Sequence, residues 1–255
     1  MDLKVLGCHG GETPRHRTTA FLIDDRLTLD AGALTSQLTL ADQAKLELVL
    51  VSHAHLDHVK DLAAIADNRA QMDSPPLRIA AVKATIEHLR THMFNDKLWP
   101  DFTRIPSVHQ PTILFEEIPI ETPTQLLDYR VTAVPVSHTV DTSGFIIDDG
   151  RGAIAFSGDT GPTDRLWEML NGIQQLRALL IEVSFPNRRQ GLATTSGHHT
   201  PQTLAIDLQK YQSPQDLPTF LYHIKPYFQG EVERECAKLK GLDLHVLKLK
   251  EQFIL

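Results

Sequence analysis

One short segment of the sequence carries three histidines and an aspartate within six residues: His53, His55, Asp57 and His58. Imidazole and carboxylate groups are the side chains that bind zinc and similar divalent cations. In a tight turn His53 and His55 can point the same way. Asp57 and His58 are adjacent and diverge, so they could serve a second centre. Two neighbouring centres of this kind would suit a hydrolase that uses two metal ions.

The flanking sequence places this segment at the end of a strand. Residues 46–51 form an apolar run, which is typical of a buried strand, and residues 59–66 repeat apolar side chains at helical spacing. The segment therefore lies in a turn from strand to helix, at the rim of a sheet. His138, Asp159 and His223 also follow strand-like runs. Chance would place some of these residues inside strands or helices, so the pattern favours one site at a sheet edge.

The remaining sequence alternates strands and helices around an all-β segment, residues 112–156. A hairpin predicted over residues 18–30 ends in Asp30, which could support a metal ligand or simply close the turn. We expect a helix over residues 34–45. Another helix is predicted to start at Pro162, because proline favours the first helical position.

Two loops could line a cleft. The Gly10–Gly11 pair would let the backbone approach a ligand closely, although such a pair can equally form a tight turn. The irregular stretch 95–102 carries Trp99, with Phe94 and Phe102 on either side. These aromatic side chains could cover a flat ligand, or they could only pack the loop.

Length and composition predict one globular domain spanning residues 1–255. The chain is 42% hydrophobic and 22% charged, and it contains no linker-like tract or repeat. Its formal net charge of -7 argues against a protein that coats nucleic acid or an anionic membrane. A small anionic substrate remains compatible, because bound divalent cations invert the local charge.

Cysteine usage and hydropathy favour a cytoplasmic protein. Cys8 and Cys236 are the two cysteines, and so few thiols fit a reducing compartment. Residues 1–7 enter an alternating strand directly and lack the apolar core of a signal peptide. No apolar run approaches the roughly 20 residues of a membrane span, so we expect no membrane partner.

Taken together, these residues resemble the ligand set of the metallo-β-lactamase superfamily. The resemblance implies an α/β fold, an αββα four-layer sandwich with two mixed sheets, outer helices and a dinuclear metal site at one edge. It implies three groups of ligands: His53, His55 and His138 for one metal, Asp57, His58 and His223 for the other, and Asp159 as a bridge. The expected cofactors are two divalent ions, zinc first, with manganese or iron as alternatives.

A finer resemblance is to the class II cyclic-nucleotide phosphodiesterases. It rests on the following stretches: residues 6–11, 55–59, 94–95 with 99–102, 158–163, 182–187 and 197–201. The resemblance implies that a 3′,5′-cyclic nucleotide, cyclic AMP by expectation, is hydrolysed to the 5′-monophosphate by a metal-bridging hydroxide. Two positions depart from the family pattern. Asp61 and His9 stand where small residues are usual, which leaves the substrate preference open.

The same resemblance points to His198 and Glu182 as a catalytic pair, with Asp57 also counted as catalytic. His198 would protonate the leaving alkoxide, since the pKa of an imidazole lies near working pH. Glu182 follows the apolar run 179–181 and would hold the tautomer of that histidine. The adjacent His199 could serve instead, or both histidines could pack the start of the next helix.

Other activities fit the same ligands. An RNase Z-like tRNA 3′-end endonuclease shares them and a related His–Glu pair, but the protruding arm and basic surface of that family are not evident here. A glyoxalase II-like thioesterase is more distant, and a non-catalytic metal-bound scaffold would belong to another class altogether. We therefore expect a small-molecule partner and no nucleic acid, and the sequence leaves a homodimer open.

Overall fold

The computed structural model describes residues 1–72, 74–212 and 217–255. Within these ranges the strands form two seven-stranded sheets and a two-stranded ribbon. The first sheet has the order β16 (Gln252–Ile254), β1 (Asp2–Gly7), β2 (Ala20–Ile23), β3 (Leu27–Leu29), β4 (Leu48–Leu50), β5 (Leu77–Ala81) and β8 (Ile113–Glu117). The second has the order β15 (Leu244–Val246), β14 (Thr219–Tyr222), β13 (Leu176–Glu182), β12 (Ala153–Phe156), β11 (Ser143–Asp148), β10 (Tyr129–Pro135) and β9 (Thr124–Leu126).

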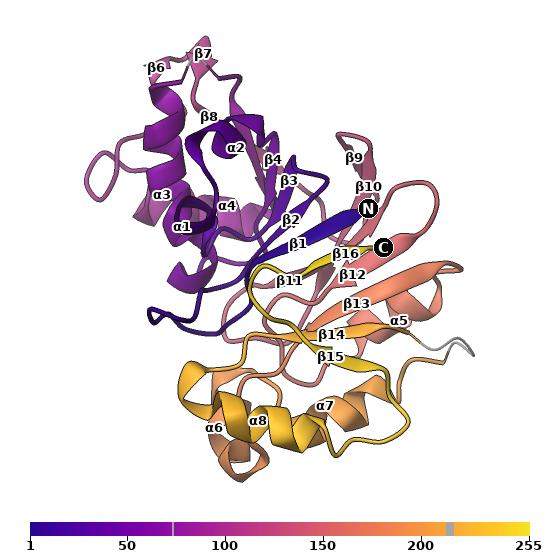
Figure 1. Ribbon diagram of the computed structural model, residues 1–255. Helices are drawn as coiled ribbons and strands as arrows, with labels where there is room; N and C mark the ends of the chain where they lie inside the picture. Colours follow the sequence, from indigo (N-terminus) through magenta and orange to yellow (C-terminus); the bar gives the residue numbers. More distant parts are fainter. Residues whose placement is uncertain (73, 213–216) are drawn as a thin grey trace.

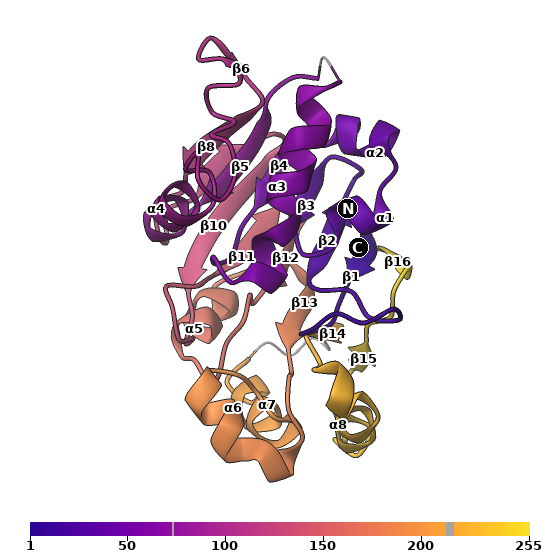
Figure 2. The ribbon, with the colours of Figure 1, turned by 90° about the vertical axis from the view of Figure 1, so that its left-hand side faces the viewer.

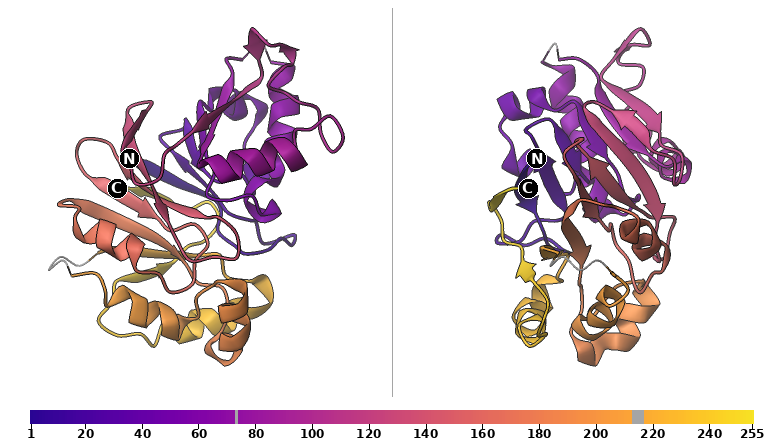
Figure 3. Two further views of the ribbon diagram at one scale, coloured as in Figure 1. Left: turned by 180° about the vertical axis from the view of Figure 1, so that it is seen from behind. Right: turned by 90° about the vertical axis from the view of Figure 1, so that its right-hand side faces the viewer.

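The ribbon pairs β6 (Pro106–Ser107) with β7 (Gln110–Pro111). Because β1 and β16 pair in antiparallel fashion, the two ends of the chain lie side by side (Figure 3). Among the described residues, no helix combines the length and the apolar character that crossing a membrane requires.

Helices cover the outer faces of both sheets (Figures 1 and 2). Those beside the first sheet are α1 (Leu34–Gln37), α2 (Leu40–Lys45), α3 (Leu56–Ala70) and α4 (Lys83–His92). Those beside the second are α5 (Arg165–Asn171), α6 (Gln190–Ser196), α7 (Pro201–Leu208) and α8 (Gln229–Cys236). Helices α6, α7 and α8 gather at one end of the molecule (Figure 1). The α5, α7 and α8 helices pack on the sheet through Trp167, Leu204 and Val232.

Strand alternation produces the four layers. On β4, Leu48 and Leu50 enter the core between the sheets, whereas Val49 faces the core under the helices. On β12, Phe156 lies between the sheets and Ala155 lies under the helices. Successive side chains of a strand point to opposite faces, so strands buried on both faces read as continuous apolar runs. The predicted αββα sandwich is confirmed.

Strand direction brings the chemically active residues to one edge of each sheet. In the first sheet β1 and β3 both run antiparallel to β2, and β4 runs parallel to β3. In the second sheet β10 and β12 both run antiparallel to β11, and β13 and β14 run parallel to β12. The carboxyl ends of β1, β3 and β4 therefore lie at one edge of the first sheet, and those of β10, β12, β13 and β14 lie at one edge of the second.

Two predicted helices differ from the structure. Residues 34–45 form α1 and α2 rather than one helix, because Leu38 adopts an extended conformation, with ψ 135°, and Thr39 then caps α2 by accepting a hydrogen bond from Asp42 N at 3.2 Å. Helix α5 begins at Arg165, not at Pro162. The backbone N–H of Thr163 donates instead to Asp207 Oδ2 at 3.2 Å, which ties this segment to α7.

Candidate metal centre

The turn between β4 and α3 brings two of its histidines together with His138, which follows β10. The Nδ1 atom of His55 lies 3.0 Å from His53 Nε2 and 3.2 Å from His138 Nε2. His53 is fully buried, whereas His55 and His138 are partly exposed. Three imidazole nitrogens thus converge on one point that solvent and ligands can reach.

A second triad lies beside the first. His58 Nε2 is 3.2 Å from His223 Nε2, which lies 3.3 Å from Asp57 Oδ2. His58 comes from the first turn of α3, and His223 follows β14 in the second sheet. The two triads correspond to the groups that the sequence assigned to two metals, and both have ligand atoms within 4.8 Å of one another.

Asp159 stands between the triads. Its Oδ2 atom lies 3.2 Å from His58 Nε2, 3.3 Å from His223 Nε2 and 3.8 Å from His53 Nε2. The other oxygen, Oδ1, is buried and has no hydrogen-bond partner among the described residues. A buried carboxylate oxygen left unpaired is costly, so this donor set fits bound cations.

Two buried carboxylates orient the imidazoles from outside. The Asp30 carboxylate accepts from Ser52 Oγ at 2.8 Å and pairs with His58 Nδ1 at 2.7 Å. Ser52 Oγ in turn lies 3.0 Å from His53 Nδ1. A proton on each Nδ1 leaves the inner Nε2 lone pair available to a cation, which is how outer carboxylates support metal-binding histidines.

Glu182 builds the same kind of network on the second sheet. Ser184 Oγ donates to Glu182 Oε2 at 3.0 Å and lies 3.0 Å from His223 Nδ1. His198 Nδ1 lies 2.6 Å from Glu182 Oε1, which also accepts from Thr160 N at 3.1 Å. Asp30 and Glu182 are both fully buried, so each is a buried charge whose lone pairs are met by a serine, a histidine and a backbone N–H.

The protonation states suit cation binding. Burial would raise the pKa of Asp159, but the charges of His223 and His58 hold it well below its usual range. Burial lowers the pKa of His53, and lowers that of His223 to about 4. His58 is the exception, because Asp159 and Asp30 raise its pKa against the effect of burial. Cation binding would displace that proton, since ligation needs the neutral imidazole.

The structure separates the two neighbouring histidines. The ring of His198 stacks on that of His223, with centroids 5.3 Å apart, and Glu182 raises the pKa of His198 although burial opposes the shift. His199 turns away, and its Nδ1 lies 3.2 Å from Thr203 Oγ1 at the start of α7. The pair named from the sequence, His198 and Glu182, is therefore together at the site, and His199 packs a helix.

Several contacts at the site were not anticipated from the sequence. Ser52 and Ser184 have no motif of their own, although Ser52 directly precedes His53. The carbonyl of Gly197 lies 2.9 Å from His138 Nδ1. Lys225 Nζ lies 4.0 Å from Asp57 Oδ2. These contacts depend on loops that meet only in the folded chain.

The two positions that depart from the family pattern face other parts of the molecule. The Asp61 carboxylate accepts from Thr35 N at 2.8 Å and Thr35 Oγ1 at 2.9 Å, at the start of α1. His9 Nδ1 lies 3.3 Å from the carbonyl oxygen of Arg17. Gly10, by contrast, packs against the site: a Cβ at this position would lie 2.5 Å from the carbonyl oxygen of His223.

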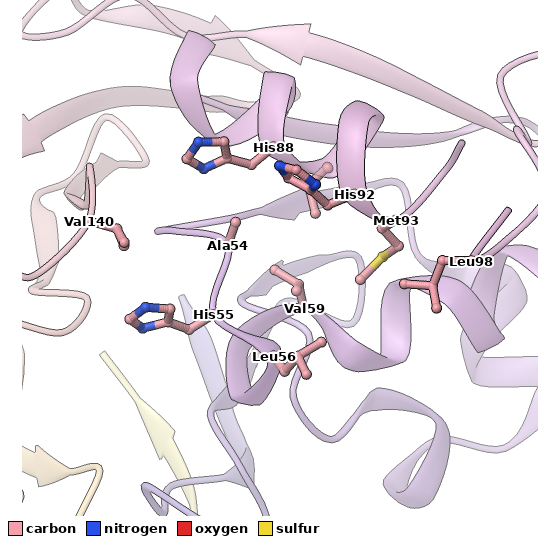
Figure 4. Close-up of a pocket in the computed structure, with 10 residues that line it drawn as sticks. Ala54, His55, Leu56, Val59, His88, His92, Met93, Leu98 and Val140 are labelled. Atoms are coloured by element: carbon pink, nitrogen blue, oxygen red, sulfur yellow. The ribbon is translucent and has the colours of Figure 1, made fainter. Parts of the chain in front are cut away.

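The aromatic side chains near α4 do not cover the site. Phe94 and Phe102 are each only 3% exposed and belong to the core between the first sheet and its helices, so the expectation that they cover a ligand is wrong. Trp99 packs against the same core. The loop instead contributes Leu98 to a cavity beside His55 (Figure 4).

Comparison with known proteins agrees with this architecture. Residues 21–219 match the family model described as a β-lactamase superfamily domain. A Yersinia pestis protein named "Probable 3′,5′-cyclic-nucleotide phosphodiesterase" is 33% identical over 205 residues, which is 70% of this chain and 57% of that protein. The chain therefore spans less than two thirds of that relative.

A 3′,5′-cyclic-nucleotide phosphodiesterase of Aliivibrio fischeri is 26% identical over 275 residues, 88% of this chain and 81% of that protein. The crystal structure of unliganded yeast PDE1 superposes with a TM-score of 0.83 at 18% identity, covering 98% of each chain. With the family model spanning most of the sequence and two helix-flanked mixed sheets in the structure, the chain belongs to the β-lactamase superfamily and has the metallo-β-lactamase fold.

Proposed function

We propose that the chain is a metal-dependent phosphodiesterase that hydrolyses 3′,5′-cyclic nucleotides, cyclic AMP among them, to 5′-monophosphates. The observation that carries this proposal is the pair of ligand triads with Asp159 between them, together with His198, whose ring stacks on His223 and pairs with Glu182. The names of the two curated relatives supply the substrate class.

The proposed cofactors are two divalent cations, zinc first, with manganese or iron as alternatives. The residues that would hold them are His53, His55 and His138 on one side, Asp57, His58 and His223 on the other, and Asp159 between. Bound in such a site, two cations acidify a water molecule and offset the negative charge of a phosphodiester. Asp30 and Glu182 keep the imidazoles in the orientation and tautomer that this binding needs.

The contact between His198 and Glu182 supports a role for His198 as a proton donor. Its Nδ1 is held by Glu182 at 2.6 Å, which leaves Nε2 as the nitrogen that can serve a substrate. Hydrolysis expels the 3′-oxygen as an alkoxide, a poor leaving group, and an acid that protonates it lowers the barrier. Glu182 stabilises the imidazolium form through its charge and hydrogen bond, so we propose His198 as the general acid.

The decisive experiment combines metal analysis with a substrate panel. Protein purified without chelator is expected to hold about two metal ions per chain and to convert cyclic AMP or cyclic GMP to the 5′-monophosphate. The same preparation is tested on 2′,3′-cyclic AMP, bis-p-nitrophenyl phosphate and precursor tRNA. Cleavage of another phosphodiester without cleavage of any 3′,5′-cyclic nucleotide overturns the substrate proposal. Near-zero metal that zinc or manganese cannot restore overturns the site itself.

A further inference from the structure

A cavity of about 230 Å³ opens beside the candidate metal centre, next to His55. Four segments form it: the start of α3, one face of α4, the loop after α4 and the loop after His138. Figure 4 shows His88 and His92 projecting from α4 on the opposite side of the cavity from His55 and Leu56. A substrate whose phosphate reached the ligand triads would have this cavity as a neighbour.

The cavity is lined mostly by apolar side chains, with no Asp, Glu, Lys or Arg among the lining residues that the structure describes. Val59, Leu89 and Met93 form buried parts of its wall, at most 6% exposed, while Leu56 and Leu98 are 68% and 65% exposed. Leu56 and Leu98 line the same concavity as these buried side chains, and a concave, mostly apolar surface next to a candidate active site is typical of a ligand-binding pocket. Among the described residues, the lining contains no carboxylate, ammonium or guanidinium group, so a group that is mostly apolar suits it.

The polar atoms of the cavity belong to imidazoles. His88 and His92 stand one helical turn apart on α4, with ring centroids 6.1 Å apart, and both are exposed. In the part of the chain that the structure describes, no side-chain hydrogen bond or ion pair involves either ring, and the two rings lie tilted at 48° to one another. A neutral imidazole offers one donor and one acceptor, so the pair can meet the polar edge of a heteroaromatic ring.

We infer that this cavity holds the nucleobase of the substrate, and that Leu98, His88 and His92 set its affinity. The inference rests on the proposed function and deepens it. A cyclic nucleotide joins an anionic phosphate to a neutral heteroaromatic base, and the candidate metal centre lies beside a mostly apolar cavity that carries imidazole groups. Leu98 packs on the face of the base, and the two imidazoles meet its edge.

The test compares a substrate with and without its base. The variants are H88A/H92A and L98A, with H109A as a matched control, because His109 is exposed and lies between β6 and β7 outside this cavity. Kinetics are measured on cyclic AMP, cyclic GMP and the abasic ribose 3′,5′-cyclic phosphate. Binding of adenosine is measured separately by calorimetry, since it needs no turnover.

We expect H88A/H92A and L98A to raise KM for at least one cyclic nucleotide by about tenfold and to weaken adenosine binding by a similar factor. Their kcat/KM on the abasic ester should stay within about twofold of wild type, and H109A should match wild type throughout. Equal losses on both substrate types, or no loss on either, overturn the inference while the proposed function stands. A wild-type protein that cleaves neither cyclic AMP nor cyclic GMP overturns the proposed function, and the inference with it.

Discussion

At the scale of single residues, the site is organised by two buried carboxylates that touch no substrate in our proposal. Asp30 contacts His58 directly, and it contacts His53 through the hydroxyl of Ser52. Glu182 contacts His198 directly, and it contacts His223 through the hydroxyl of Ser184. Each carboxylate therefore contacts two imidazoles, one directly and one through a serine. Removing its charge should change the metal affinity or the rate of hydrolysis, depending on which histidines it contacts.

The first residue-scale prediction concerns the proton donor. H198A should retain both metals and lose about 10²–10⁴ in kcat on a cyclic nucleotide, because the alkoxide would leave unprotonated. On bis-p-nitrophenyl phosphate the loss should be much smaller, since p-nitrophenolate needs no proton. H199A serves as the control: it should lower the melting temperature without changing the ratio of the two rates. Equal losses on both substrates would exclude the acid role, and a loss of metal would make His198 a ligand.

The second concerns Asp30. Its φ of 56° lies in the left-handed region, which asparagine also tolerates, so D30N removes the charge with little change to the backbone. The Asn side chain cannot serve Ser52 and His58 as two acceptors do, and we expect metal affinity to fall by about 10–100-fold. Competition against a chromophoric chelator measures this directly. An unchanged affinity would show that Asp30 only closes the turn after β3.

At the scale of elements, the loops that follow the strands position the candidate metal ligands. One glycine, Gly10, shows how closely two of these loops pack. Gly10, in the loop after β1, passes so close to His223 that a Cβ would lie 2.5 Å from its carbonyl oxygen and 2.9 Å from its Nδ1. The chain segments after β1 and β14 come from different sheets. Their close approach therefore couples the two sheets at the site.

G10A should accordingly displace the loop that carries His223. We expect a destabilisation of about 1–3 kcal/mol, the usual cost of overpacking, together with weaker metal binding. G11A is the matched control, since its Cβ would meet only the ring of Pro226, at 3.1 Å, and a small shift relieves that contact. Thermal unfolding with and without metal separates the two variants; equal behaviour of both would contradict the role assigned to Gly10.

The turn between β11 and β12 carries a pH-dependent contribution to stability. Burial would raise the pKa of Asp149, but hydrogen bonds from the backbone N–H of Arg151 and from the Arg177 and Arg151 guanidinium groups lower it to about 2. A carboxyl group whose pKa is lower in the folded state stabilises that state above its unfolded pKa. The contribution is lost as the pH falls through about 2.

D149N should therefore lower the free energy of unfolding by about 1 kcal/mol at pH 7, after allowance for solvent screening. The difference from wild type should persist down to about pH 4, shrink below it and vanish only below about pH 2. Denaturant unfolding at several pH values measures it. Asp25, which is 57% exposed and pairs only with Lys4 among the described salt bridges, supplies the control D25N, for which we expect little effect at any pH.

At the scale of the whole molecule, the candidate centre joins the two sheets. His53, Asp57 and His58 come from the first sheet and its α3 helix, whereas Asp159 and His223 follow strands of the second. The core between the sheets contains side chains from both, such as Phe21, Phe156 and Tyr222. We propose that residues 1–255 unfold as one domain, and that bound cations stabilise it by linking its halves.

Metal removal tests this proposal. Cations that bind only the folded chain stabilise it by about 2.7 kcal/mol at a hundredfold excess over Kd, which for a chain of this length corresponds to roughly 5–10 °C in Tm. Dialysis against a chelator should lower Tm by that amount, and zinc or manganese should restore it, in a single calorimetric transition. Two transitions would contradict the single domain, and an unchanged Tm would contradict metal binding between the sheets.

The sequence by itself determined the ligand types and the strand ends that carry them, because apolar runs followed by histidine or aspartate are local patterns. It also indicated the four-layer fold through a family resemblance. It could not show that the predicted helix over residues 34–45 is interrupted at Leu38. The extended backbone there lets Thr39 cap α2, and this capping outweighs the helical propensity of the segment. Nor could it show that Phe94 and Phe102 turn into the core, because burial of a loop aromatic depends on what packs above it.

Only the tertiary structure shows which of the adjacent residues His198 and His199 lies beside Glu182. The choice depends on Glu182, sixteen residues away along the chain, and on the left-handed backbone of Gly197 that ends α6 just before them. It likewise decided that Asp30 and Glu182 each hold one imidazole directly and a second one through a serine. Such contacts join segments far apart in sequence, and their energies depend on distance and burial, which exist only once the chain has folded.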